Sequence, residues 1–255
     1  MTDPAAVLGR IEGVPSAVRS GLDAVDTLLR DRGMRTVPAE QSAKALHAGA
    51  RASAEIADRD EPAPDGTSWE AGAVRAATQV LELAPLIRKE PGQVIARVHA
   101  LVARGYLPED GLGRQRNDPG VGERMVGLHA LLTTPTEASA LVVAAIAHAE
   151  IATVRPFGAG DGIVARLVEH LVLIEAGIDP RAVVVAAAGH RAAGAEYTHA
   201  LEEYANGGPV GVREWILHCV RAVSYGAEVS PLAEIPVRKQ QGAPRGPKNG
   251  SANTD

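Results

Sequence analysis

The chain has 255 residues and a formal net charge of −5, with an isoelectric point near 5.9, which argues against a general nucleic-acid-binding protein because those are usually basic. Hydrophobic residues make up 45% of the chain but aromatic residues only 3%, so the core must be built from aliphatic side chains and alanine, which favours helices. The length suits one sizeable domain or two small ones, and the single Cys219 excludes a disulfide framework and a cysteine-rich zinc site.

The N-terminal part of the chain predicts two helices followed by a loop. Its first residues contain no basic region followed by an apolar run, so we expect no secretory signal. Periodic apolar positions predict an amphipathic helix over 16–32, closed by Gly33. A helix of small residues is predicted over 39–58, and the turn formers at 59–66 predict a loop.

Two more helices are predicted before the middle of the chain. Thr67 and Glu70, three positions apart, form a capping-box pattern, which predicts a helix that reaches about Arg88. Proline is favoured in the first turn of a helix, so Pro91 predicts the start of the next one, which Gly105 ends.

An irregular segment with five glycines and two prolines, 105–122, precedes a short predicted helix over 123–132. The sequence TPTE at 134–137 is a second capping-box pattern, so we expect the central helix of the protein to begin there. The residue before a proline resists the helical conformation, which predicts the end of this helix at Arg155 and Pro156.

The C-terminal part predicts further helices and then a tail. Residues 231–255 lack periodic apolar positions and are mildly basic, which predicts a disordered tail that aids solubility rather than contacting an acidic partner. The expected organisation is therefore N-terminal helices over 1–60, a helical core over 67–228 and this tail. The helices predicted before the tail run over 162–176 with Gly177 as stop, from a cap at Asp179-Pro180, over 192–205 and over 209–226.

A glycine-rich turn, IATVRPFGAGDG at 151–162, joins the central helix to the next one. The N-terminus of a helix offers unpaired N–H groups to anions, and the glycines at 158, 160 and 162 allow a concave backbone that can hold a phosphate. The turn matches neither the Walker nor the dinucleotide-binding pattern, and a helix rather than a strand precedes it. Taken alone, the pattern favours a plain turn between helices.

Two arginines, Arg155 and Arg166, bracket this turn, and Arg166 lies one helical turn beyond Gly162, from where it can reach an anion at the helix end. Taken alone, each of them is better explained as a surface or ion-pair residue. His148 and Glu150 match the first half of a zinc deaminase signature, but its two-cysteine half cannot exist in this chain, so His148 is expected to be a buried structural residue. No metal site is predicted, because no ligand spacing connects Glu169, His170, His190, His199 and His218.

In combination, AIAHAEIATV, RPFGAG, DG and IVARL resemble the signature of the Fic (Fido) family, H-P-F-x-[DE]-G-N-G-R-x-x-R, and the resemblance spans about residues 40–225. It implies an all-α bundle with a central helix–loop–helix. In active members it implies transfer of AMP, or another phosphate-containing group, from a nucleotide to a protein hydroxyl. His148 lies where many members have a histidine before the motif. GLGRQR, ending at Arg116, resembles the start of the family's flap, and 50–58 resembles its inhibitory helix.

The chain departs from this motif where the chemistry of the family is carried out. Arg155 replaces the histidine that is the general base, and a guanidinium cannot accept a proton. Losing a positioned base costs about a hundred- to ten-thousand-fold in rate. Ala159 replaces the acidic Mg²⁺ ligand, so no Mg²⁺ is expected, Asp161 replaces the asparagine and Ile163 the first arginine. The retained motif residues are Pro156, Phe157, Gly160, Gly162 and Arg166.

Two other family features are altered. Aligning Ser53 with the family serine places Ala57 and Asp58 where the inhibitory Glu-Gly would be, although a slip of two residues would place Glu55 there. Only NDPGVGE separates Arg116 from the next predicted helix, so the flap that holds the target segment is expected to be shortened to a turn.

The leading hypothesis is an inactive Fido protein that acts as a binding or regulatory module for an unidentified protein partner or a phosphate-bearing small molecule. The alternative is an enzyme with altered chemistry, in which Arg155 and Arg166 clamp a phosphate and Asp161 acts as base, although an N-cap role for Asp161 is favoured. A third possibility is that the site binds a nucleotide without reaction, or that Asp161 fills and closes it by pairing with Arg155 or Arg166.

Composition and the absence of a long apolar span also predict a cytoplasmic protein that binds neither nucleic acid nor membrane, and a homo-oligomer is possible. The candidate anion-binding residues are Arg155, Gly158, Gly160, Asp161, Gly162 and Arg166, with Pro156, Phe157 and His148 as structural residues.

Overall fold

The computed structural model describes residues 3–31 and 37–235. Within these ranges the chain forms helices and no strand, which confirms the predicted all-α class. No helix of the described part combines the length and apolar character needed to cross a lipid bilayer. The predicted tail begins too early, because Pro231–Glu234 form the 3₁₀ helix η4 with Leu232 buried. The rest of the tail, from residue 236, lies outside the described residues, as does the predicted stop at Gly33.

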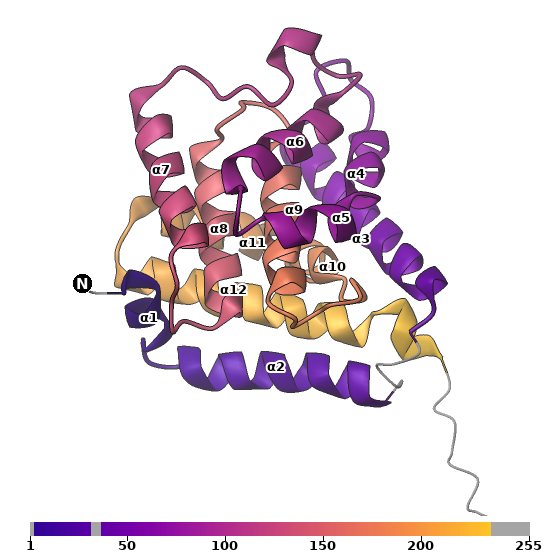
Figure 1. The fold of residues 1–255 in the computed structure, drawn as a ribbon, viewed down its shortest axis with the longest axis vertical. Helices are drawn as coiled ribbons and strands as arrows, with labels where there is room; N and C mark the ends of the chain where they lie inside the picture. Colours follow the sequence, from indigo (N-terminus) through magenta and orange to yellow (C-terminus); the bar gives the residue numbers. More distant parts are fainter. Residues whose placement is uncertain (1–2, 32–36, 236–255) are drawn as a thin grey trace, which may run out of the picture.

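Two antiparallel neighbours, α8 (Ala140–Val154) and α9 (Asp161–Glu175), form the centre of the fold (Figure 1). Nearly all of α8 is buried, because a helix that is apolar on every side must be covered on every side. Trp215 of α12 (Pro209–Glu228) reaches into this centre and donates its indole N–H to the Ala145 carbonyl at 2.7 Å.

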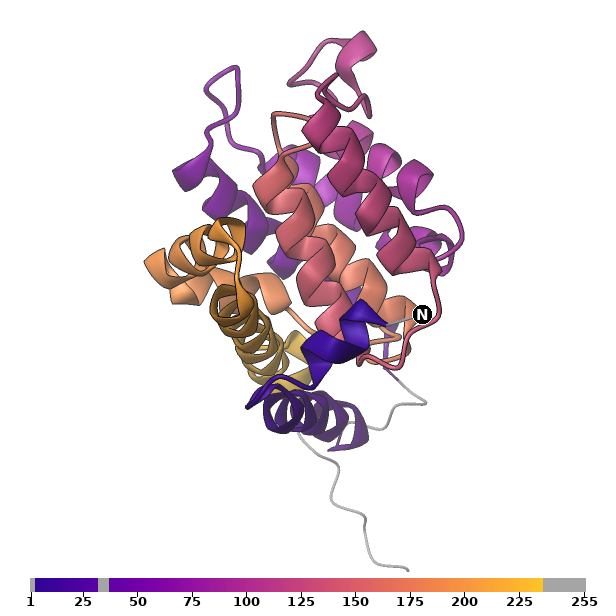
Figure 2. The same cartoon turned by 90° about the vertical axis from the view of Figure 1, so that its left-hand side faces the viewer.

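The other helices cover this central pair. The helix α2 (Val14–Asp31) lies alongside α12, and the two cross one end of the bundle (Figures 1 and 2). On other sides, α6 packs against α9, and α7 and α11 pack against α8. The bounds of the remaining helices are α1 (Pro4–Gly9), α3 (Ala39–Asp60), α4 (Glu70–Ala77), α5 (Val80–Leu83), α6 (Pro91–Ala103), α7 (Pro119–Thr133), α10 (Ala186–Ala193) and α11 (Ala195–Asn206), with 3₁₀ turns η2 (Ala84–Leu86) and η3 (Glu109–Gly111).

One glycine permits an unusually close approach between helices. Gly189 of α10 faces α12, and a Cβ atom at this position would lie only 2.4 Å from the Cα of Ala222. Because the nearest atoms belong to the backbone of Ala222, a larger side chain would force the two helices apart. Glycine at this position therefore holds α10 close to α12, and with it the side chains that α10 directs into the core.

Both predicted capping boxes are wrong. The helix α8 begins at Ala140 with Ser139 as N-cap, three residues beyond the TPTE pattern. The Thr136 hydroxyl and the Glu137 N–H bind the carboxylate of Asp3 instead, so a contact 133 residues away in sequence outweighs the local capping pattern. Thr67 likewise bonds to Asp65 rather than to Glu70.

Several predicted helices are divided or shifted. The helix expected from Thr67 to Arg88 is divided into α4, α5 and η2. Pro85, within η2, has no N–H group with which to continue the helical hydrogen bonds. Asp179 does not cap a helix at 181, because its carboxylate accepts the N–H groups of Val183 and Val184, both at 2.9 Å, and the next helix starts at Ala186. Gly194 separates α10 from α11, so the helix predicted over 192–205 begins three residues later, at Ala195.

Candidate functional site

The glycine turn reverses the chain between α8 and α9. Arg155 ends α8 in the left-handed conformation with φ of 49°, and Gly158 and Gly160 follow with φ of 84° and 72°. Glycine adopts these angles without strain, whereas a residue with a Cβ pays an energetic cost. The strained residue is therefore Arg155, at the position of the motif histidine.

The interior of this turn is filled by the side chain of Asp161, the first residue of α9. The side chain is buried, and its Oδ1 accepts the backbone N–H of Phe157 at 2.9 Å. Its Oδ2 is also buried and has no hydrogen-bond partner among the described residues. Burial raises the pKa of Asp161 to about 7, and the nearby charge of Glu61 acts in the same direction. A backbone donor that an incoming anion would need is thus already used by a carboxylate of the chain itself.

A second carboxylate, Glu61, closes the turn from the end of α3. It forms an ion pair of 2.7 Å with Arg155, whose guanidinium also donates to the Gly158 carbonyl at 3.2 Å. Partial burial raises the pKa of Glu61, while Arg155 and a backbone hydrogen bond from Gly160 oppose the rise. The cation at this turn is therefore already neutralised within the protein.

The segment that resembles the start of a flap lies directly on the turn. The Arg116 guanidinium donates to the carbonyls of Val154 and Arg155, at 3.0 and 2.9 Å. Its backbone N–H donates to the Pro156 carbonyl at 2.7 Å. Beyond it, Asp118 caps α7, so the described chain has no flap strands between Arg116 and this helix. This agrees with the predicted shortening.

Phe157 anchors the turn to α6. Its ring stacks on that of His99, with centroids 4.0 Å apart and planes inclined by 5°. His99 is fully buried, and its Nδ1 accepts the Gly113 N–H at 2.9 Å. Burial lowers the pKa of His99 to about 4. A neutral imidazole therefore packs against Phe157, and the turn is held in shape by apolar contact.

Arg166 lies beside the turn, and its guanidinium is bonded into the core. Its exposed fraction is 6%, and all three guanidinium nitrogens are bonded. Nε and Nη2 donate to the hydroxyl and carbonyl of Ser53 at 2.8 and 3.0 Å, and Nη1 donates to the Tyr197 hydroxyl at 2.9 Å. Ser53 is thus the residue of α3 that meets Arg166, whereas Glu55 forms an exposed ion pair with Arg191.

An open cleft of about 400 Å³ lies between the end of α3, the turn and α11. Arg155, Arg166 and Gly162 line it, and Gly162 lies against the Arg166 guanidinium. The candidate arginines therefore share one cleft, but each is bonded within the protein. The acidic lining residues Asp60, Glu61 and Glu202 make the remaining surface unfavourable for a phosphate.

Behind Arg166 lies a buried polar network that was not predicted from the sequence. The Tyr197 hydroxyl bonds to Nε2 of His148 at 3.0 Å, and Nδ1 of His148 bonds to Glu169 at 2.7 Å. Glu169 also bonds to Nε2 of His190 at 2.9 Å, and Nδ1 of His190 bonds to His218 at 3.0 Å.

Burial shifts the pKa values of two of these histidines, and their contacts shift that of the carboxylate. Burial lowers the pKa of His148 to about 4 and that of His218 to about 3. Burial alone would raise the pKa of Glu169, but its contacts with His190 and His148 outweigh this and hold it below the usual range. His148 is enclosed by Tyr197 and Glu169 and does not face the glycine turn.

Replacing Glu61 with glutamine is expected to change the free energy of unfolding by less than about 1 kcal/mol, because the pair with Arg155 is partly exposed. The same change should leave Arg155 free to hold an anion, so pyrophosphate should raise the melting temperature of the variant more than that of the wild type. Urea unfolding and thermal shift measure the two effects. A loss of more than about 2 kcal/mol would instead make this pair a structural element.

No protein-family model and no curated protein matches the sequence. Among solved structures, the chain is similar to a Fic family protein from Desulfovibrio desulfuricans G20, with a TM-score of 0.59 and 21% identity. The similarity covers 81% of this chain and 73% of that chain. The chain therefore has the all-α Fic fold that the sequence resemblance predicts.

Proposed function

We propose that this protein is a catalytically inactive Fic-fold protein that serves as a binding or regulatory module. The observation that carries the proposal is the closed glycine turn, where Asp161 occupies a backbone donor and Glu61 pairs with the cation that nucleotide phosphates would need. A negatively charged ligand would have to displace two carboxylates before it could bind there.

The groups needed for transfer chemistry are also replaced. Arg155 cannot accept the proton of a target hydroxyl, and it is held by Glu61. Ala159 supplies no carboxylate for a divalent cation, so the charge of a transferred phosphate would not be neutralised by a metal. Base and metal ligand are lost from the same loop.

The phosphate clamp is replaced as well. Ile163, at the position of the first motif arginine, is fully buried in the hydrophobic core. Arg166, the second arginine, is bonded to Ser53 and Tyr197. One position therefore contributes to packing and the other to a buried network, and both support a role for the motif in shape rather than in catalysis.

A second candidate is a phosphate- or nucleotide-binding enzyme with altered chemistry. It is favoured by the cleft of about 400 Å³ beside the turn and by the pKa of Asp161 near 7, which is the range of a general base. It would require the turn to open, since Asp161 now bonds to Phe157. In either case the ligand is a protein partner or a phosphate-bearing small molecule rather than nucleic acid.

A labelling assay tests the proposal. The purified protein is incubated with α-labelled ATP and Mg²⁺ or Mn²⁺, with and without cell lysate, beside an active Fic enzyme as positive control. We expect no label on the protein or on lysate proteins above that of a heat-treated sample. Robust labelling that is lost in a folded Asp161→Ala variant would show an active enzyme and favour the second candidate.

A further inference from the structure

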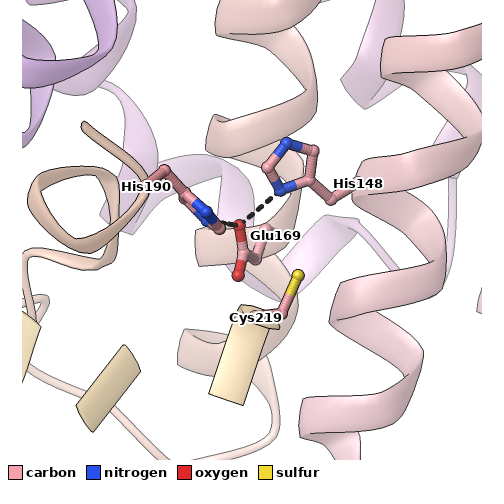
Figure 3. A group of neighbouring side chains, drawn as sticks. All are labelled: His148, Glu169, His190 and Cys219. Atoms are coloured by element: carbon pink, nitrogen blue, oxygen red, sulfur yellow. Dashed lines mark hydrogen bonds and ion pairs between the residues drawn. The ribbon is translucent and has the colours of Figure 1, made fainter. Parts of the chain in front are cut away.

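The core contains four side chains of the kinds that bind metals, each from a different helix. His148 comes from α8, Glu169 from α9, His190 from α10 and Cys219 from α12, and they point toward one another (Figure 3). One potential ligand atom from each lies within 4.8 Å of all the others. All four residues are buried, with exposed fractions of at most 2%.

We propose that these four residues form a structural site for a zinc-class divalent cation. Two imidazole nitrogens, a carboxylate oxygen and a thiolate sulfur are a donor set that zinc favours, and zinc binds four such ligands tetrahedrally. With the cysteine deprotonated, the charges of Cys219 and Glu169 balance the two positive charges of the ion. The loaded cluster is then neutral, as a site in a low-dielectric core requires.

The Glu169 oxygen lies somewhat closer to the two imidazole nitrogens than ligands of a tetrahedral site lie to one another. Oε2 of Glu169 lies 2.7 Å from Nδ1 of His148 and 2.9 Å from Nε2 of His190. Two ligands about 2.1 Å from a tetrahedral zinc lie roughly 3.4 Å apart. The imidazoles would have to move outward by about half an ångström, which small adjustments of the side-chain torsions within the same rotamers can supply without movement of the helices.

The nitrogen atoms that would not face the ion already have partners. Nδ1 of His190 bonds to His218 at 3.0 Å, and Nε2 of His148 bonds to Tyr197 at 3.0 Å. Histidines that bind metals almost always have a hydrogen-bond partner on the second nitrogen, which fixes the tautomer and the ring orientation. This cluster therefore has an outer shell in place.

Four protein ligands leave no open position, which is typical of structural rather than catalytic zinc. The ion would join α8 and α9, which carry the glycine turn, to α10 and α12. The cluster uses no residue of the turn, so this inference stands independently of the proposed function. Because metal binding contributes directly to folding, the expected effect is on stability.

Metal content and cobalt spectroscopy test the site. Tag-free protein, produced with zinc and dialysed without chelator, should contain about one zinc per chain by elemental analysis. Free zinc at about a hundred times its dissociation constant should raise the melting temperature of the metal-depleted protein by roughly 5–10 °C. Cobalt should give a thiolate-to-metal charge-transfer band and the visible bands of tetrahedral Co²⁺.

Two variants assign these signals to the cluster. Cys219→Ala removes only a small buried side chain and should abolish the charge-transfer band, while His99→Gln, at a buried histidine outside the cluster, should keep the band and the bound zinc. Protein without stoichiometric metal, and with no change in melting temperature on adding zinc, would overturn the proposal. Metal binding that Cys219→Ala leaves fully intact, with the same cobalt spectrum, would also overturn it.

Discussion

Replacing Arg166 with methionine is expected to lower the free energy of unfolding by about 3–5 kcal/mol. Methionine keeps much of the volume but removes three hydrogen bonds, two to Ser53 and one to Tyr197. It also removes the buried cation nearest the network that contains Glu169. Breaking such a network costs more than an exposed pair, because the remaining polar groups stay buried without partners. Urea unfolding measures the change.

A matched control separates burial from the loss of charge. Arg191→Met removes an exposed arginine whose partner is Glu55 and should cost less than about 1 kcal/mol. If Arg166→Met were also within about 1 kcal/mol of the wild type, the guanidinium would not be part of the core. It would then be free to bind a ligand in the cleft.

Replacing Asp161 with asparagine should stabilise the protein at neutral and alkaline pH. The amide oxygen can still accept the Phe157 N–H, while the charge that burial disfavours is removed. Because one pKa unit corresponds to about 1.4 kcal/mol and the pKa is raised from 3.8 to about 7, we expect a gain of about 2–4 kcal/mol at pH 8.

The sign of the pH dependence follows from the raised pKa. The folded state holds the Asp161 proton up to about pH 7, whereas the unfolded chain releases it near 3.8. The contribution of this group to stability is therefore lost as pH rises between these values, and asparagine does not titrate. The advantage of Asp161→Asn should grow by about 2–3 kcal/mol between pH 5 and pH 8. An advantage that is independent of pH would mean that Asp161 is ionised throughout.

The central helix–loop–helix could be predicted because its signals are local. The glycines, the proline and the apolar helices at 151–162 specify the turn, and the resemblance built on them predicts the fold that the structural comparison shows. The start of α8 could not be predicted in this way. Its position depends on Asp3, which binds Thr136 although it lies 133 residues earlier in the chain.

The site itself was predictable only in part. Asp161 could be identified from its motif position, but the predicted closure by pairing with an arginine is wrong in its partner, because Asp161 binds the Phe157 N–H. Glu61, which pairs with Arg155, was not among the candidates because only the fold brings the two together. The same holds for Glu169 and His190, which are 21 residues apart and have no ligand-like spacing. Their contact results from the packing of α9 and α10, for which no local pattern exists.

The retained motif residues and the buried network hold the helices of the fold together. Phe157 packs on His99, and Arg166 joins Ser53 of α3 to Tyr197 of α11. These contacts join α3, α6, α9 and α11 around the glycine turn.

The most direct test of the account is nucleotide binding to the wild-type protein at pH 7.5, by calorimetry and thermal shift with ATP, with and without Mg²⁺. A nucleotide present at about a hundred times its dissociation constant would add about 2.7 kcal/mol, or roughly 5–10 °C in melting temperature. We predict no shift beyond that of sodium chloride at equal ionic strength, because Asp161 and Glu61 occupy the turn. Saturable, Mg²⁺-dependent binding of ATP would contradict a turn closed by its own carboxylates.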